Sequence, residues 1–166
     1  MSLLFAAIGA TVAALLEASL APHLVVGNAY LHPVLVLAVI WTIAAGFERG
    51  LVVAFVGGLV LDILFSATRP LGASAFALLI AVGGATLIVQ PLSRLRTLAP
   101  IIAVPVLSLA YSMLIYILTS SSGATVADPV ATFIPGAIYD GLLGLVAGPL
   151  IVSIRARRAQ VERVDW

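Results

Sequence analysis

Three ionisable side chains lie inside long apolar stretches of the sequence, and they are the residues best suited to chemistry. They are Glu17, Asp62 and Asp140. An ionisable side chain at bilayer depth costs about 2.5 to 3.5 kcal/mol on insertion scales, so such residues are candidates for function or for pairing. Counted along helices with a rise of about 1.5 Å per residue, Glu17 and Asp62 fall in the outer half of the membrane and Asp140 falls nearer its middle. They could share one outward-facing polar pocket, or each could meet water or lipid headgroups.

Two of these acids belong to a pattern of very small residues at four-residue spacing, which places the pattern on one helix face. It runs through Gly50, Ala54, Gly58 and Asp62, with Gly57 beside it, and again through Gly136, Asp140, Gly144 and Gly148. Ridges of small residues let helix backbones approach closely. We therefore expect each aspartate to point into a seam between helices, with Arg69 as the counter-ion of Asp62. The ridges serve either internal packing or the docking of a partner helix.

Other kinds of chemistry have little support. The chain has no cysteine, which excludes disulfides, thiolate nucleophiles and sulfur-ligated metals. His23 and His32 share one connection, but no carboxylate ligand is near them in the sequence, which argues against a metal site. No phosphate-binding glycine loop and no Ser-His-Asp set is recognisable. The sequence thus predicts a protein that is not an enzyme and that holds no cofactor and no metal.

The composition defines the elements that must position these residues. Of 166 residues, 63% are hydrophobic and 9% are charged, whereas a soluble domain carries about 25% charge. A transmembrane helix needs about 20 mostly apolar residues. Six stretches qualify, at roughly 3–21, 31–47, 50–66, 70–91, 99–119 and 131–154. The prediction is an all-α membrane protein, a six-transmembrane-helix bundle that forms a single domain over residues 1–166.

The arginines orient this bundle. The eight basic residues are all Arg; seven fall on the side shared by both termini and Arg69 alone falls on the other. Basic residues favour the cytoplasmic side, so both termini are predicted to be cytoplasmic. The first stretch is not expected to be a signal peptide, because no basic region precedes it and Glu17 lies inside it. The expected cytoplasmic charged surface, which faces lipid headgroups or soluble partners rather than nucleic acid, consists of Glu48, Arg49, Arg94, Arg96, Arg155, Arg157 and Arg158.

The most specific pattern lies between Pro33 and Ala75. It comprises Pro33 with Leu35-Val36-Leu37, Glu48-Arg49-Gly50, Gly57-Gly58, Asp62, Ser66, Pro70-Leu71-Gly72 and Ala75. A glycine-spaced helix thus ends in an aspartate, and a very short turn leads to a Leu-Gly that opens the next helix. In these residues and in its size the chain resembles the MreD family of small membrane proteins of the bacterial rod-shape (elongasome) system.

The resemblance implies a non-enzymatic scaffold in the bacterial cytoplasmic (inner) membrane. Such a protein binds MreC, which has a single membrane span, and acts with RodA, its transpeptidase partner and the actin-like MreB. Its role is cell-shape maintenance and lateral peptidoglycan synthesis; membrane lipids and a second copy of the chain are further expected partners.

Two other function classes remain open. A similar six-helix fold is expected for the vitamin-binding membrane component of energy-coupling-factor transporters, and this is the alternative function. The sequence favours the scaffold, because the outer loops are short and no cluster of aromatic and hydrogen-bonding side chains is visible that would enclose a vitamin. An intramembrane enzyme or an unrelated channel forms the third class.

Overall fold

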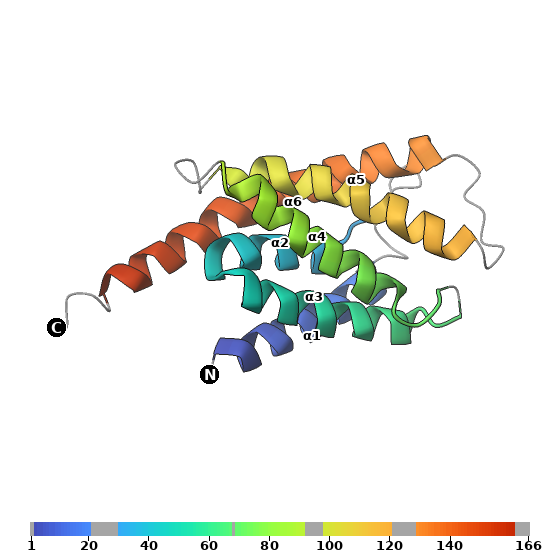
Figure 1. Ribbon diagram of the computed structural model, residues 1–166, viewed down its shortest axis with the longest axis horizontal. Coiled ribbons are helices and arrows are strands. Elements are labelled where there is room, and N and C mark those ends of the chain that lie inside the picture. The colour runs from blue at the N-terminus through green and yellow to red at the C-terminus, as the bar shows by residue number, and fades with distance from the viewer. Residues whose placement is uncertain (1, 21–29, 68, 92–97, 121–128, 162–166) are drawn as a thin grey trace.

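All regular secondary structure in the described part of the chain is α-helical. The computed structural model describes residues 2–20, 30–67, 69–91, 98–120 and 129–161. The helices (Figure 1) are α1 (Ser2–Leu20), α2 (Pro33–Ala45), α3 (Phe47–Leu64), α4 (Ala73–Val89), α5 (Ala99–Ser120) and α6 (Pro129–Val161). These bounds lie close to the predicted ones, with three exceptions. The helix α3 begins three residues before Gly50, α4 begins three residues after Pro70, and α6 continues well past residue 154.

The helices differ in their capacity to cross a membrane. Three of them contain a segment long and apolar enough to do so, namely Leu3–Leu20, Ala99–Ser120 and Ala131–Ile151. The chain is therefore consistent with an all-α membrane protein. The helices α2 and α4 are apolar but have 13 and 17 residues, and α2 is about 20 Å long against a hydrocarbon core of about 30 Å. The start of α1 and the end of α6 lie at one end of the bundle, and α6 projects beyond it (Figure 1).

The short helix α2 lies at the centre of the bundle. It packs against each of the other five helices, and its side chains are mostly buried. Around it, α1 packs on α3, α3 on α4, α4 on α5 and α5 on α6, whereas the described residues of α1 and α6 do not pack on each other to a comparable extent. Among the described residues, the ring of helices that surrounds α2 is therefore open between α1 and α6.

The small residues of α3 bring two neighbouring helices close to it. A methyl group added at Gly50 would overlap the side chain of Thr42 on α2. One added at Gly58 would overlap the backbone of Ala75 on α4, and Ala54 between the two glycines is fully buried. The ridge on α3 is thus filled by helices of the same chain.

The ridge on α6 is filled in the same way by α5. A methyl group at Gly144 would come within 2.9 Å of Val104, and one at Gly148 within 2.5 Å of Pro100. The two helices run antiparallel with four-residue steps on both sides. In this register the opposed pairs are Gly148 with Pro100, Gly144 with Val104, and Asp140 with Ser108. The glycine-lined contact between α5 and α6 therefore continues directly into the polar contact between Ser108 and Asp140.

We expect Gly58→Ala to destabilise the bundle, whereas Gly83→Ala should not. The added methyl at position 58 meets backbone atoms of Ala75, which cannot move aside, while nothing lies within 4 Å of the same methyl at position 83. Overpacking of this kind costs about 1 to 3 kcal/mol, and Gly→Ala in an open helix interior gains about 0.5 to 1 kcal/mol. Thermal unfolding in detergent measures both. Equal melting temperatures for the two variants would contradict the close approach of α3 and α4.

Candidate functional site

Asp62 lies at the end of α3 and binds the start of α4. Its Oδ1 accepts a hydrogen bond from the Ser74 N–H at 2.9 Å, and its Oδ2 accepts from the N–H groups of Gly72 at 2.9 Å and Ala75 at 3.3 Å. The first N–H groups of a helix have no partner within the helix and carry partial positive charge. A fully buried carboxylate thus supplies the N-terminal cap of the neighbouring helix. The positive φ of Gly72, 94°, turns the chain into this position.

Two more buried acids serve the start of α2. The Glu17 Oε2 on α1 accepts from the Val34 N–H at 3.1 Å. The Asp140 Oδ1 on α6 accepts from the His32 N–H at 2.8 Å. Glu17 and Asp140 are 4% and 0% exposed, so both are buried with the donors that they satisfy. The central helix is therefore capped by the first and the last helix of the chain.

Asp140 also organises a polar cluster. Its Oδ2 is 2.8 Å from His32 Nδ1 and accepts a hydrogen bond from the Ser108 hydroxyl at 2.5 Å. The His32 ring stands nearly perpendicular to the ring of Tyr111, with centroids 5.2 Å apart. Because Ser108 donates to Asp140 and not to His32, the cluster lacks the serine-to-histidine hydrogen bond of a hydrolase nucleophile.

The predicted ion pair between Asp62 and Arg69 is absent from the described residues. Asp62 takes backbone N–H donors instead, and Arg69 donates to the Ser74 hydroxyl at 3.3 Å. Its guanidinium also lies over the Phe65 ring, 5.1 Å from the centroid. Arg69 and Asp62 are thus linked through Ser74, not by a direct charge pair. The physical reason is that backbone donors at the start of α4 occupy both carboxylate oxygens.

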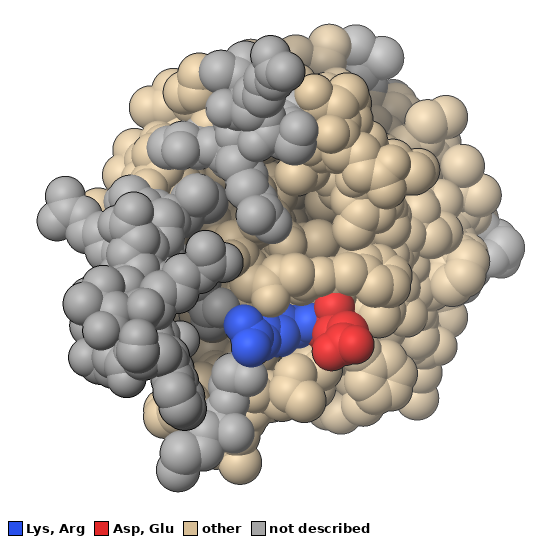
Figure 2. All heavy atoms as spheres, turned by 60° about the vertical axis from the view of Figure 1, so that its left-hand side comes forward, with Lys and Arg blue, Asp and Glu red and all other residues tan. Residues whose placement is uncertain are grey.

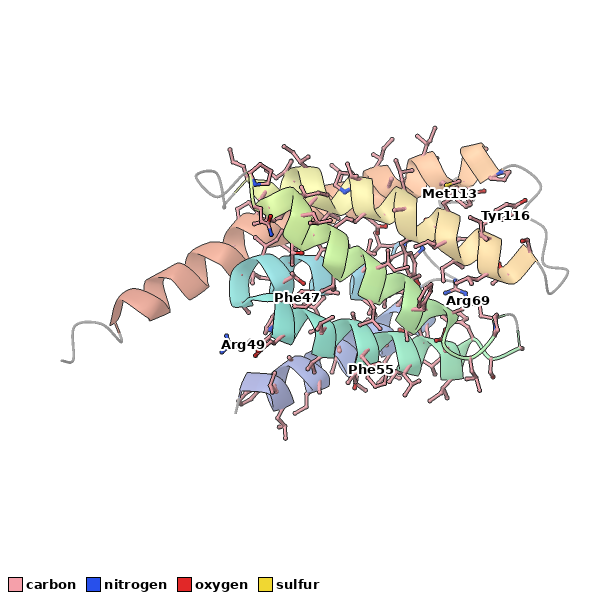
Figure 3. The ribbon with its side chains drawn as sticks, viewed as in Figure 1. Phe47, Arg49, Phe55, Arg69, Met113 and Tyr116 are labelled. Atoms are coloured by element: carbon pink, nitrogen blue, oxygen red, sulfur yellow. The ribbon has the colours of Figure 1, made fainter. Side chains whose placement is uncertain are left out.

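A shared polar pocket was one possibility for the three acids, but none of them is among the residues that line the pocket described here. The pocket in this region has a volume of about 220 Å³ and lies where α5 ends and α6 begins. Four aromatic rings face it, those of Tyr30, Tyr111, Tyr116 and Phe133, together with the charged or titratable side chains of Arg69 and His32. Arg69 and Tyr116 are at the same end of the bundle, opposite Arg49 (Figure 3). An aromatic and hydrogen-bonding cluster that the sequence did not reveal is therefore present.

The opposite end carries the predicted charged surface in part. Glu48 is exposed and Arg49 is half-buried in the first turn of α3, and Figure 2 shows acidic and basic side chains adjacent on this end among uncharged ones. Arg155, Arg157 and Arg158 lie on the projecting part of α6. Arg94, Arg96 and His23 lie outside the described residues.

Three residues of the polar region were missed as site residues. His32 was set aside for want of a carboxylate, yet Asp140 meets it from 108 positions away. Tyr111 gives no sign in the sequence of facing a pocket. For Ser108 a signal existed, because it follows Pro100 and Val104 at four-residue spacing and so lies on the face that packs against the α6 glycines. Within the described ranges no three His, Cys, Asp or Glu side chains are placed to hold a metal ion.

Comparisons with known proteins do not identify a family for this chain. No protein-family model, no curated protein and no solved structure matches the chain.

We expect Asp62→Asn to destabilise the protein more than Glu17→Gln. Asp62 uses both oxygens for three N–H donors, and an amide offers one oxygen, so at least one buried N–H loses its acceptor at about 1 to 3 kcal/mol. Glu17 uses one oxygen for one N–H, which a glutamine oxygen can replace. Thermal unfolding in detergent provides the measure. A melting temperature for Asp62→Asn at or above that of Glu17→Gln would refute the capping role.

Proposed function

We propose that this chain is a non-enzymatic membrane scaffold of the bacterial rod complex, similar to MreD. In this proposal six segments cross the cytoplasmic membrane with both termini inside. The bundle binds an MreC-like protein with a single membrane span, and through it supports RodA, its transpeptidase partner and MreB in cell-shape maintenance and lateral wall synthesis.

The observation that carries the proposal is that residues of the MreD-like pattern act as one structural unit. Gly58 allows the backbone of Ala75 to approach α3, and Asp62 then caps the helix that follows Gly72. Apolar sequences often contain glycines and an occasional acid by composition alone. Members of this pattern that are apart in the sequence, by contrast, meet where α3 ends and α4 begins, and they stabilise the same contact. This supports the resemblance beyond a similarity in composition.

The partner helix needs a surface that the chain has not already filled. The small ridges on α3 and α6 are occupied internally, so they are not free for docking. The opening between α1 and α6 leaves one face of α2 half-buried, at Leu37, Trp41 and Ala44. In lipid, helices associate through close van der Waals fit and a few polar contacts. A single-span partner would complete the ring around α2 at this opening.

Photocrosslinking from two exposed phenylalanines tests this assignment. Phe5 on α1 shares a helix face with Gly9, which lies against Leu37 of α2, so it borders the opening. Phe76 on α4 is exposed to a similar degree, 54% against 65%, but α4 lies between α3 and α5. With p-benzoylphenylalanine in place of Phe5, illuminated native membranes should yield an adduct with a single-span protein. The same replacement of Phe76 should not.

Two outcomes would contradict the scaffold proposal. One is the absence of any protein adduct from Phe5 in cells that produce the variant at the normal level. The other is an adduct only with a second copy of the chain, which would make the opening a dimer contact.

A vitamin-binding component of an energy-coupling-factor transporter is the second candidate. The pocket of about 220 Å³ favours it, because four aromatic rings and several hydrogen-bonding side chains face one cavity near the end of the bundle. This removes the argument that no such cluster exists.

Gentle detergent extraction from native membranes separates the two candidates. The scaffold should co-purify with a single-span protein that has a coiled-coil domain outside the membrane. The transporter component should co-purify with ATPase subunits, and its preparation should contain a small organic compound. Recovery of ATPase subunits without the single-span protein would overturn the first proposal in favour of the second.

A further inference from the structure

We propose that the pocket between α5, α6, the residues just before α2 and the turn before α4 binds a small anion that carries one planar ring, an aromatic carboxylate. This inference does not rest on either proposed function, because a scaffold and a transporter component could each hold such a ligand. It rests on the charge, the unsatisfied donor, the walls and the size of the pocket.

The charge of the pocket comes from Arg69. Each buried acid nearby is already satisfied: Asp62 by the start of α4, Glu17 by the start of α2 and Asp140 by His32. Within the described ranges no carboxylate pairs with Arg69, and its hydrogen bond there is to a neutral serine hydroxyl at 3.3 Å. A guanidinium has five N–H donors in a planar fork that matches a carboxylate. Among the described residues, the Arg69 guanidinium therefore has N–H groups that a carboxylate in the pocket could engage.

A second donor in the pocket is also unsatisfied. The Tyr111 side chain is 1% exposed and lines the pocket, and its hydroxyl has no hydrogen-bond partner among the described residues. Ser74 is a polar neighbour of this hydroxyl, but the two do not reach hydrogen-bond geometry. A buried hydroxyl without a hydrogen-bond partner is energetically unfavourable, and an acceptor on a ligand would remove that cost.

The aromatic walls and the volume of the pocket favour a ligand with one planar ring. The rings of Tyr116 and Phe133 meet edge to face with centroids 6.0 Å apart, and Tyr30 and Tyr111 add further aromatic surface. A cavity of about 150 Å³ holds one benzene molecule, and each water of a liquid fills about 30 Å³. A pocket of about 220 Å³ therefore has room for one six-membered ring and a group of carboxylate size.

The remaining nitrogen of His32 adds a polar contact to this pocket. Asp140 engages the Nδ1 atom at 2.8 Å, which fixes the ring orientation and leaves Nε2 as the ring nitrogen for a ligand. His32 itself is 12% exposed and lines the pocket. A ring with a polar substituent away from its carboxylate would use this contact.

Binding of 4-fluorobenzoate by the purified protein in nonionic detergent tests the proposal. Fluorine-19 NMR titration, with empty micelles as the blank, gives the dissociation constant. The neutral isostere 4-fluorobenzamide should bind at least tenfold more weakly, because it cannot pair with Arg69. This comparison uses the unmodified protein, so it does not depend on the folding of any variant.

Three variants locate the binding. Arg69→Gln should raise the dissociation constant for 4-fluorobenzoate at least tenfold, because it removes the charged fork. Tyr111→Phe keeps the ring and removes the hydroxyl, and should raise the constant about threefold to tenfold, the value of one neutral hydrogen bond. Arg49→Gln, a loss of the same charge at the other end of the bundle (Figure 3), should leave it unchanged.

Several results would overturn the proposal. They are equal binding of the acid and the amide, equal binding by the Arg69→Gln variant and the unmodified protein, or no binding of either probe above the blank. A further one is stabilisation by phosphatidylglycerol over phosphatidylcholine in the micelles without any binding of 4-fluorobenzoate. That result would assign Arg69 to a lipid headgroup instead.

Discussion

The bundle depends on buried carboxylates that cap the helix starts of neighbouring helices. An apolar environment offers no water to the first N–H groups of a helix, so protein groups must satisfy them. The two short apolar helices, α2 and α4, begin among the other helices, and each of them meets an acid there: Glu17 and Asp140 act on α2, and Asp62 acts on α4. Each acid also lies where the partial positive charge of a helix start favours a carboxylate. The insertion cost of the acids is thereby offset.

Capping and close packing require each other. Asp62 reaches three N–H groups of α4 only because Gly58, one turn before it, lets the α4 backbone lie against α3. On the other side of the bundle, the glycines of α6 bring α5 close enough for Ser108 to reach Asp140. A larger residue at either seam would move donor and acceptor apart. The small residues and the acids therefore act together to hold neighbouring helices, which explains their common four-residue spacing.

The sequence predicted the helices and the helix faces that carry these small residues and acids, but not the contacts that they make. Hydropathy and the positions of Pro33 and Pro70 located the helix starts within a few residues, and four-residue spacing placed both aspartates in seams. The assignment of Arg69 as the counter-ion of Asp62 was wrong, because charge was matched with charge. The actual donors are backbone N–H groups, which every residue except proline carries and which no pattern of side chains reveals.

The pocket escaped prediction because its walls come from distant parts of the chain. Its walls come from α5, α6, the start of α2 and the turn before α4, so no local stretch contains more than part of it. His32 lacked a carboxylate in its own stretch, and Asp140 is brought to it by a register along α5 and α6 that only the packed glycines define. Long-range contacts of this kind follow from packing rather than from spacing.

The use of acids as caps has a consequence for the arginine. If Asp62 had paired with Arg69, the start of α4 would have lacked its acceptors and the pocket would have contained no uncompensated charge. Instead, Asp62 accepts hydrogen bonds from the start of α4. The Arg69 guanidinium remains at the pocket, next to Ser74 and the Phe65 ring. Among the described residues this half-buried cation has no acidic partner, and a bound anion would supply one. The constraint that stabilises the fold thus also leaves the pocket ready to bind one.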